Sequence, residues 1–219
     1  MREENGGLLL GPYEVGAPVC YVDGPSADSE YELFQADMDR LMPHIETAIA
    51  RVPAFAEVGV KEVYNGAIAY TPDGSPMVGP AWGLQNFWLN EGHSFGITAA
   101  GGSGWQLAEW IVEGEPSLDM MGVDPRRFGP YASRGYLKAK NEEAYANVFS
   151  VHYPDEERAA ARPLKRSPCY ERMESLGAVF GSVYGWERPN WFAPEGYALS
   201  EAEMNKPDVL LSETGAAPD

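Results

Sequence analysis

Hydrophobic positions recur at two different periods in the first half of the chain. Between residues 29 and 51 they fall mostly three or four positions apart, which predicts an amphipathic helix that Pro43 breaks or kinks. The run at residues 8–14, bracketed by glycine and proline, is typical of a strand. Residues 58–70 are rich in β-branched and aromatic side chains and predict another strand, which Gly66 interrupts with a turn or a close backbone approach.

The centre of the chain alternates between turn signals and apolar runs. Proline, aspartate and glycine at residues 71–76 predict a turn, and residues 86–90 predict a strand that enters a glycine-marked bend. A helix is predicted after the bend, and Gly114 closes it. One face of this helix is expected to carry Gln106, Leu107, Trp110 and Ile111.

Beyond this helix the sequence pattern changes to a cap signal and a charged segment, and we place a domain boundary near residue 118. A cap signal at residues 124–129 precedes a charged helix predicted at residues 136–145. Residues 177–186 are typical of a short strand or a buried turn between glycines. Residues 196–219, rich in Glu, Ala and Pro, predict a loosely ordered tail.

Composition narrows the choice of partners. The chain has 33 acidic and 16 basic residues and a formal net charge of −17, so its field repels polyanions and nucleic acid is not an expected partner. Cys20 and Cys169 stand far apart, which predicts buried free thiols and no metal site. No apolar run approaches the roughly 20 residues of a membrane span. The first residues lack the apolar region of a signal peptide, so we expect a cytoplasmic protein with no membrane partner.

The strongest chemical signal is the segment 86–107, which predicts a strand, a glycine-rich bend and the start of a helix. Its glycines are Gly92, Gly96, Gly101, Gly102 and Gly104. Glycine lets another molecule approach the backbone, and the first turn of a helix offers unpaired N–H groups to an anionic or electron-accepting group. Tight packing of a strand against a helix would demand the same glycines without any ligand. A dinucleotide fingerprint of the G-x-G-x-x-G type after an N-terminal strand is absent.

Several ordered blocks carry a family resemblance. They are TPDGSPMVGP (71–80), GLQNFW (83–88), GHSFGI (92–97), AGGSG (100–104), LAEWI (107–111), DPRRF (124–128) and GWERPNWF (185–192). Together they resemble the dimethylglycine and sarcosine dehydrogenase branch of the FAD-dependent amine oxidoreductases, over about residues 5–195. The resemblance implies an α+β fold: residues 1–117 as the C-terminal part of the FAD-dependent oxidoreductase domain, and residues 118–195 as a small mixed linker domain. In the first part it implies antiparallel substrate-sheet strands, including residues 8–14, and the last strand and helix of the FAD-binding fold.

The resemblance also assigns candidate site residues. The cofactor-binding candidates are Gly66, Gly92, Ser94, Phe95, Gly96, Ile97 and Thr98, and the catalytic candidates are His93 and Tyr13. The backbone N–H groups of Gly96, Ile97 and Thr98 would face the pyrimidine end of the flavin, where negative charge gathers on reduction. His93 could equally cap the bend, and Tyr13 could equally be a packed strand tyrosine. Arg126 and Arg127 are expected to be solvated or ion-paired.

The implied function is oxidation and demethylation of a small N-methyl amine, with FAD as hydride acceptor and possibly tetrahydrofolate in the full assembly. The sequence lacks the dinucleotide-binding lobe and a folate-binding domain, so both are expected as partner domains or chains, and the chain is not expected to be active alone. The alternatives left open are a non-catalytic module that links an FAD lobe to a folate-binding domain, and a related flavoprotein that acts on another small amine.

Overall fold

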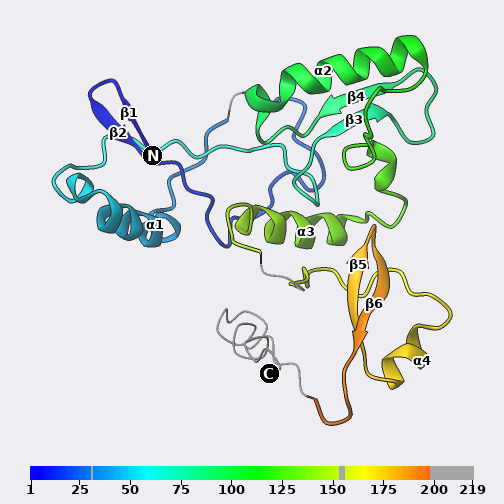
Figure 1. The fold of residues 1–219 in the computed structure, drawn as a ribbon. Helices are drawn as coiled ribbons and strands as arrows, with labels where there is room; N and C mark the ends of the chain where they lie inside the picture. Colours follow the sequence, from blue (N-terminus) through cyan, green and yellow to red (C-terminus); the bar gives the residue numbers. More distant parts are fainter. Residues whose placement is uncertain (31, 153–155, 198–219) are drawn as a thin grey trace, which may run out of the picture. The chain divides into compact units, whose positions relative to one another are not determined.

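The structure, a computed structural model, describes residues 1–30, 32–152 and 156–197 (Figure 1). The chain divides into two compact units, Met1–Phe149 and Ser150–Asp219, and each contains helices and antiparallel strands. The domain boundary expected near residue 118 stays a prediction. The loosely ordered tail expected at residues 196–219 falls almost entirely outside the described residues.

The first element is a hairpin of β1 (Arg2–Glu4) and β2 (Gly7–Leu9). Asn5 and Gly6 join the strands with φ values of +50° and +72°, and this pair of left-handed residues fits the twist of a tight hairpin. The strand expected over residues 8–14 therefore ends at Leu9, because β1 is only three residues long and offers no partner farther on.

Helix α1 (Met38–Arg51) begins later than the periodicity indicated. Its start is set by Asp37, whose carboxylate accepts a 3.0 Å hydrogen bond from the Arg40 backbone N–H. Pro43 was expected to break or kink the helix. It does not break it, because α1 continues to Arg51, and the Thr47 hydroxyl donates to the Pro43 carbonyl at 2.8 Å. The short 3-10 helix η1 (Pro53–Ala56) follows.

The strand expected at residues 58–70 is not formed. Within it, Gly66 makes an isolated bridge to Leu33, and the Asn65 side-chain amide donates to the Gln35 carbonyl at 2.7 Å. Val60 and Tyr64 are 61% and 71% exposed. The prediction failed because β propensity reflects packing against neighbouring strands, and the described residues provide none along this segment.

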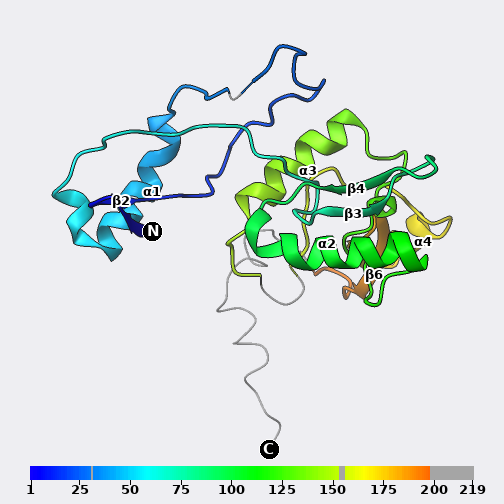
Figure 2. The same ribbon diagram turned by 90° about the horizontal axis from the view of Figure 1, so that it is seen from above.

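The centre of the first unit is a hairpin of β3 (Met77–Pro80) and β4 (Trp88–Glu91), packed against α2 (Gly96–Glu113), as Figures 1 and 2 show. Gly79 makes the contact possible, since a Cβ added there would lie 2.8 Å from the Trp110 ring. The Trp88 and Trp110 rings meet edge to face at 6.0 Å. The strand and the helix predicted around the bend are thus confirmed, with the strand shifted slightly toward the bend.

Helix α2 ends at Gly114 (φ +89°), as predicted. Gln106, 3% exposed, binds the segment beyond the helix: its amide nitrogen donates to the Ser117 hydroxyl at 3.1 Å, and its amide oxygen accepts from the Leu118 N–H at 3.1 Å. Ile111, expected on the same face, is 50% exposed. The inward face of α2 is therefore narrower than predicted.

The 3-10 helix η2 (Pro125–Arg127) and helix α3 (Arg134–Ala146) follow. The expected cap is confirmed, because the Asp124 carboxylate accepts from the Arg126 N–H at 2.8 Å. Helix α3 confirms the charged helix predicted at residues 136–145. Its Asn141 side-chain amide donates to the Tyr70 carbonyl at 2.9 Å, which ties the helix to the segment before the turn.

The Tyr136 phenol is expected to ionise at unusually high pH. Burial raises the pKa of Tyr136 to about 12, and the nearby phenol of Tyr131 adds to the rise. Since the folded-state pKa lies above the ordinary value of 10.0, this contribution to stability is complete below pH 10.0 and is lost as the pH rises toward about 12. Absorbance titration of phenolate in the chain and in Tyr136→Phe checks this, and a Tyr136 that titrates at its ordinary pKa would contradict it.

The second unit contains α4 (Tyr170–Ser175) and a hairpin of β5 (Ala178–Val183) and β6 (Trp186–Phe192). The strand expected within residues 177–186 is confirmed. Arg162 fastens the hairpin, because its guanidinium donates to both Glu187 carboxylate oxygens, at 3.1 and 2.6 Å, and to the Phe180 carbonyl at 2.7 Å.

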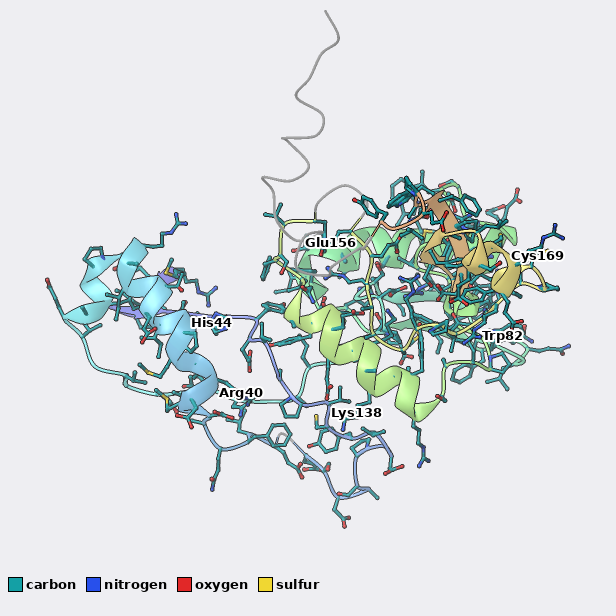
Figure 3. All side chains as sticks on the ribbon, turned by 90° about the horizontal axis from the view of Figure 1, so that it is seen from below. Arg40, His44, Trp82, Lys138, Glu156 and Cys169 are labelled. Carbon is teal, nitrogen blue, oxygen red and sulfur yellow. The ribbon has the colours of Figure 1, made fainter. Side chains whose placement is uncertain are left out.

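Both cysteines are free, as expected, but neither is buried. Cys169 lies at the start of α4 (Figure 3), and Cys20 lies in an irregular segment of the first unit. The prediction that both thiols are buried was therefore wrong. Among the helices of the described residues, none combines the length and apolar character that a membrane span requires.

Candidate functional site

The bend after β4 is a close packing point. Gly92 has φ +71°, and a Cβ added there would lie 2.8 Å from the Thr71 methyl carbon. Thr71 is 4% exposed, and its hydroxyl donates to the Ser75 carbonyl at 2.6 Å, so its methyl group cannot rotate away without breaking that bond. The predicted turn at residues 71–76 is confirmed by the 3.0 Å hydrogen bond from the Gly74 N–H to the Thr71 carbonyl. Through Thr71, this turn packs against the bend.

Arg127 holds this turn in place. Its guanidinium donates to both Asp73 carboxylate oxygens, at 2.7 and 2.9 Å, and to the Ser75 carbonyl at 2.8 Å. The Arg127 side chain is 2% exposed, whereas that of Asp73 is 42% exposed. The Asp73 carboxylate also accepts from the Ser75 N–H at 3.0 Å. A bidentate ion pair thus fixes the turn against η2.

The first turn of α2 leaves its backbone donors open. Phe95 stands at the cap position without a side-chain hydrogen bond, and the first intrahelical bond runs from Ala99 N–H to the Phe95 carbonyl at 3.0 Å. The N–H groups of Gly96, Ile97 and Thr98 precede that bond, and no acceptor for them is recorded among the described residues. A Cβ added at Gly96 would meet nothing within 4 Å, and Ile97 is 99% exposed. An electron-rich group can therefore reach these donors from outside.

His93 lies inside the bend and is half-buried. Its Nε2 lies 2.7 Å from the Asn90 side-chain oxygen. Because an amide oxygen only accepts, Nε2 is the donor in this contact. Nδ1 is buried and has no hydrogen-bond partner among the described residues. Through Nε2, His93 caps the bend, and its Nδ1 is free to contact another group.

Tyr13 belongs to an aromatic cluster. Its ring lies 4.9 Å from those of both Tyr145 and Phe149, and the Phe149 ring lies 6.3 Å from that of Phe95. The structure thus brings two candidates from distant parts of the sequence, Tyr13 and Phe95, onto one group of rings. Tyr13 lies outside any strand, and no contact among the described residues joins it to His93.

The remaining candidates fall into two places. Ser94 lies in the bend between His93 and the start of α2 and is half-buried. Gly66 lies elsewhere, against the Leu33 side chain, and lines a pocket with Tyr70 and Tyr145. The structure groups the bend residues as expected, but it records no contact between Gly66 and the bend.

Thr71, Asp73 and Arg127 were not among the predicted site residues, although they position the bend. Arg126 and Arg127 were expected to be solvated or ion-paired. Both form ion pairs, but their exposure to solvent differs. Arg126 is the half-exposed partner of Asp124, whereas Arg127 is buried. The sequence signal that could have found the pair is an aspartate inside a turn together with an arginine beside a helix cap. Within the described ranges, no group of three or more metal-ligating side chains gathers.

Comparison with known proteins gives two family matches. Residues 1–110 match the family described as FAD dependent oxidoreductase, and residues 113–167 match the FAD dependent oxidoreductase central domain.

Individual relatives agree with these matches. The chain is 42% identical over 202 residues to "Dimethylglycine dehydrogenase, mitochondrial" of Homo sapiens, which covers 90% of this chain and 23% of the relative. It is 37% identical over 201 residues to "Sarcosine dehydrogenase, mitochondrial" of Homo sapiens (90% and 22%). It is 35% identical over 224 residues to "4-methylaminobutanoate oxidase (formaldehyde-forming)" of Paenarthrobacter nicotinovorans (99% and 27%). The chain thus spans about a quarter of the length of these relatives.

Proposed function

Since this chain belongs to the FAD-dependent oxidoreductase family, we propose that it is part of an enzyme that oxidatively demethylates a small N-methyl amine. The names of the relatives support this substrate class, because dimethylglycine, sarcosine and 4-methylaminobutanoate all carry N-methyl groups. The structural observation that carries the proposal is the exposed first turn of α2, where three main-chain N–H groups have no acceptor among the described residues.

The residues of this turn fit a flavin ring. When bound, FAD would accept a hydride from the N-methyl carbon of the amine. Gly96, Ile97 and Thr98 would donate hydrogen bonds to the ring edge where negative charge develops, and the positive end of the α2 dipole would add to that stabilisation. Gly96 leaves the space for this approach, since nothing lies within 4 Å of a Cβ built on it.

The two catalytic candidates keep their roles as part of the proposal. Nδ1 of His93 is a buried ring nitrogen near the donor turn with no hydrogen-bond partner among the described residues, which suits a residue that orients a nearby group. Tyr13 would line the substrate side through its contact with the rings of Tyr145 and Phe149.

The proposal also includes the partners that would complete the assembly. The chain lacks the dinucleotide fingerprint, so we propose that an FAD-binding lobe or chain completes the flavin site. A folate-binding domain or chain, with tetrahydrofolate as acceptor of the released one-carbon unit, is a further proposed partner. The cytoplasmic location stays a prediction, and the two human relatives are named as mitochondrial proteins.

Two substitutions of Ile97 test the proposed flavin contact. Replacing Ile97 with proline removes a single N–H in the first helical turn, where proline is tolerated, and Ile97→Ala keeps that N–H while trimming an exposed side chain. We expect Ile97→Pro to weaken FAD binding about tenfold and Ile97→Ala to leave it within about twofold. Binding is measured by flavin fluorescence, with the chain alone and with an added dinucleotide-binding lobe.

Two results would count against the proposal. One is a chain that binds no flavin in either setting, which would favour the non-catalytic linking module. The other is an equal affinity for flavin in Ile97→Pro and Ile97→Ala, which would place the ring away from this turn.

A further inference from the structure

Tyr13 stands on a segment that has little main-chain support. Strand β2 ends at Leu9, and among the described residues no main-chain hydrogen bond is recorded for residues 11–20. Tyr13 is nevertheless half-buried. Its position must therefore come from side-chain contacts, and these contacts identify the residues that hold it.

The ring and the hydroxyl of Tyr13 have different surroundings. The ring lies 4.9 Å from those of Tyr145 and Phe149, tilted by 32° against the first and edge to face with the second. For the hydroxyl, no hydrogen bond is recorded within the part of the chain that the structure describes. A ring that is held by packing, with a hydroxyl left open, suits a side chain that acts on a ligand.

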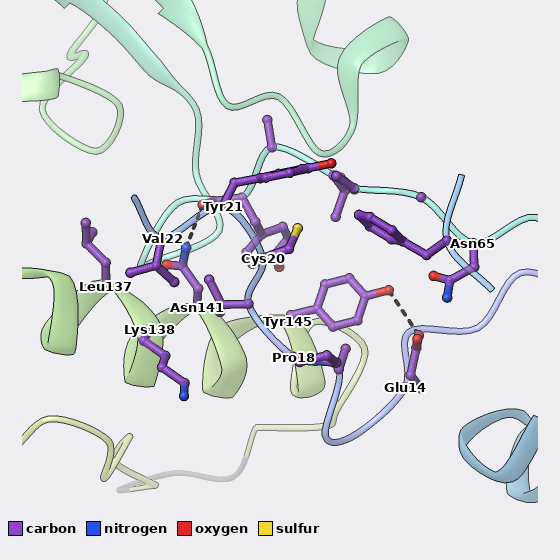
Figure 4. A pocket seen from close by; sticks show the side chains of 18 of the residues that line it. Glu14, Pro18, Cys20, Tyr21, Val22, Asn65, Leu137, Lys138, Asn141 and Tyr145 are labelled. Carbon is purple, nitrogen blue, oxygen red and sulfur yellow. Dashed lines mark hydrogen bonds between the residues drawn. The ribbon is translucent and has the colours of Figure 1, made fainter. Parts of the chain in front are cut away.

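Tyr145 contacts this segment twice. Besides packing against the Tyr13 ring, its phenol donates to Glu14 Oε2 at 3.1 Å, the bond that Figure 4 marks. Burial, and then the charge of Glu14, raise the pKa of Tyr145 above its ordinary range, so the phenol keeps its proton and stays a donor. Because Glu14 adjoins Tyr13 in the chain, this bond fixes the backbone next to the ring that Tyr145 also contacts.

The Glu14 carboxylate is itself held in place. Its side chain is 15% exposed, and the Arg40 guanidinium lies 3.5 Å from Oε1. Arg40 also pairs with Asp37, the cap of α1, at 2.8 Å. Glu14 thus receives one contact from α1 and one from α3, and the contact from α3 comes from the residue that also reaches Tyr13.

Helix α3 gives Tyr145 a fixed support. The Asn141 side-chain amide donates to the Tyr70 carbonyl at 2.9 Å, and the Tyr70 and Tyr145 rings meet edge to face at 5.5 Å. Tyr70 directly precedes the turn at residues 71–76, which packs against the bend. The same turn therefore supports both Tyr13, through α3, and the bend that leads into the donor turn.

The aromatic cluster also reaches the proposed flavin contact. The Phe149 ring lies 6.3 Å from that of Phe95, which stands at the cap position of α2. One ring, that of Phe149, thus separates Tyr13 from the residue at which the donor turn begins. This neighbourhood suits a phenol that acts on a substrate beside the flavin.

We propose that Tyr145 is a positioning residue for Tyr13, and that its ring and its bond to Glu14 hold the Tyr13 hydroxyl toward the substrate. The proposal rests on the proposed function, which gives Tyr13 its place on the substrate side. It adds a role for the central domain, because α3 lies within residues 113–167, the part that matches that family. A central-domain residue then contributes to the reaction of the oxidoreductase domain.

Flavin reduction by dimethylglycine, in the assembly with the dinucleotide-binding lobe, tests the proposal. Tyr145→Phe keeps the ring and removes only the hydroxyl that bonds Glu14, so we expect flavin reduction at saturating dimethylglycine to slow about fivefold. The matched control is Tyr136→Phe, because Tyr136 is another half-buried phenol of α3 with a raised pKa. No contact of Tyr136 with residues 13 and 14 is recorded in the described ranges, so this control should change the rate less than about twofold.

A double-mutant cycle shows whether Tyr145 acts through Tyr13. Tyr145→Phe should slow the otherwise unsubstituted chain about fivefold, but it should leave the residual rate of the Tyr13→Phe chain unchanged. A purely structural role of Tyr145 would slow both chains alike.

A second measurement needs neither flavin nor the partner lobe. In the purified chain with 13C-labelled tyrosine rings, the neighbouring rings shift the Tyr13 signals, which Tyr13→Phe identifies by their loss. We expect Tyr145→Phe to move these signals toward those of free tyrosine, and Tyr136→Phe to leave them in place.

The proposal is overturned if Tyr145→Phe and Tyr136→Phe behave alike in either measurement, or if Tyr145→Phe slows the Tyr13→Phe chain as much as the unsubstituted one. Failure of the proposed function is a different result, namely an assembly in which dimethylglycine never reduces the flavin. In that case the ring signals of Tyr13 decide by themselves whether Tyr145 holds it.

Discussion

Replacing Gly92 with alanine is expected to lower the free energy of unfolding of the chain by about 2–5 kcal/mol. A left-handed backbone costs a residue with a Cβ about 1–2 kcal/mol, and φ at Gly92 is +71°. The added Cβ would also lie 2.8 Å from the Thr71 methyl carbon, and overpacking of this kind costs about 1–3 kcal/mol. Urea denaturation followed by tryptophan fluorescence measures the loss.

The matched control for this substitution is Gly101→Ala. Gly101 lies in α2, and a Cβ there would meet nothing within 4 Å, so alanine should stabilise the helix by up to about 1 kcal/mol. If both alanine variants shifted the unfolding midpoint in the same direction, the close packing at the bend would not be a source of stability. Because the bend leads into the donor turn, Gly92→Ala should also weaken FAD binding in the titration described above.

Replacing Arg127 with methionine is expected to cost about 2–3 kcal/mol of stability. Breaking a buried pair usually costs about 3–5 kcal/mol, but Asp73 is 42% exposed and water can hydrate the carboxylate that remains. The loss would fall on the turn at residues 71–76, since Arg127 also holds the Ser75 carbonyl. Denaturant unfolding of the chain and hydrogen exchange of the Gly74 N–H measure the effect.

The neighbouring residue provides the control for Arg127. Arg126 forms an ion pair at 2.6 Å with Asp124, but its side chain is 50% exposed. Exposed pairs contribute about 0–1 kcal/mol, so Arg126→Met should change stability by less than about 1 kcal/mol. Equal effects of the two substitutions would show that burial of the Arg127 guanidinium is unimportant for the bend.

Several elements could be predicted from the sequence because short-range chemistry determines them. The turn at residues 71–76 follows from its proline, aspartate and glycine, and the end of α2 follows from Gly114. Helix α3 follows from its run of helix-forming charged residues, and η2 follows from the Asp124 cap. The donor turn at residues 96–98 was predicted for the same reason, since the first turn of any helix leaves N–H groups unbonded.

Other predictions failed where long-range partners decide the structure. Residues 58–70 have the composition of a strand, but a strand needs a neighbour to bond with, and among the described residues only the bridge between Leu33 and Gly66 forms there. The expected strand at residues 8–14 ends at Leu9, where its partner β1 ends. Helix α1 begins at Met38 because the Asp37 cap competes with the periodic pattern before it.

The sequence by itself determined the family, the glycine bend and the helix that follows, because these depend on residue identity and on contacts between near neighbours. The tertiary structure alone decided that Arg127 is buried against Asp73 while Arg126 faces water, that both cysteines are exposed, and that the Tyr145 phenol donates to the Glu14 carboxylate. Burial and pairing depend on which distant segments pack together. Neighbouring residues of the same type can therefore end in opposite environments, and no local pattern distinguishes them.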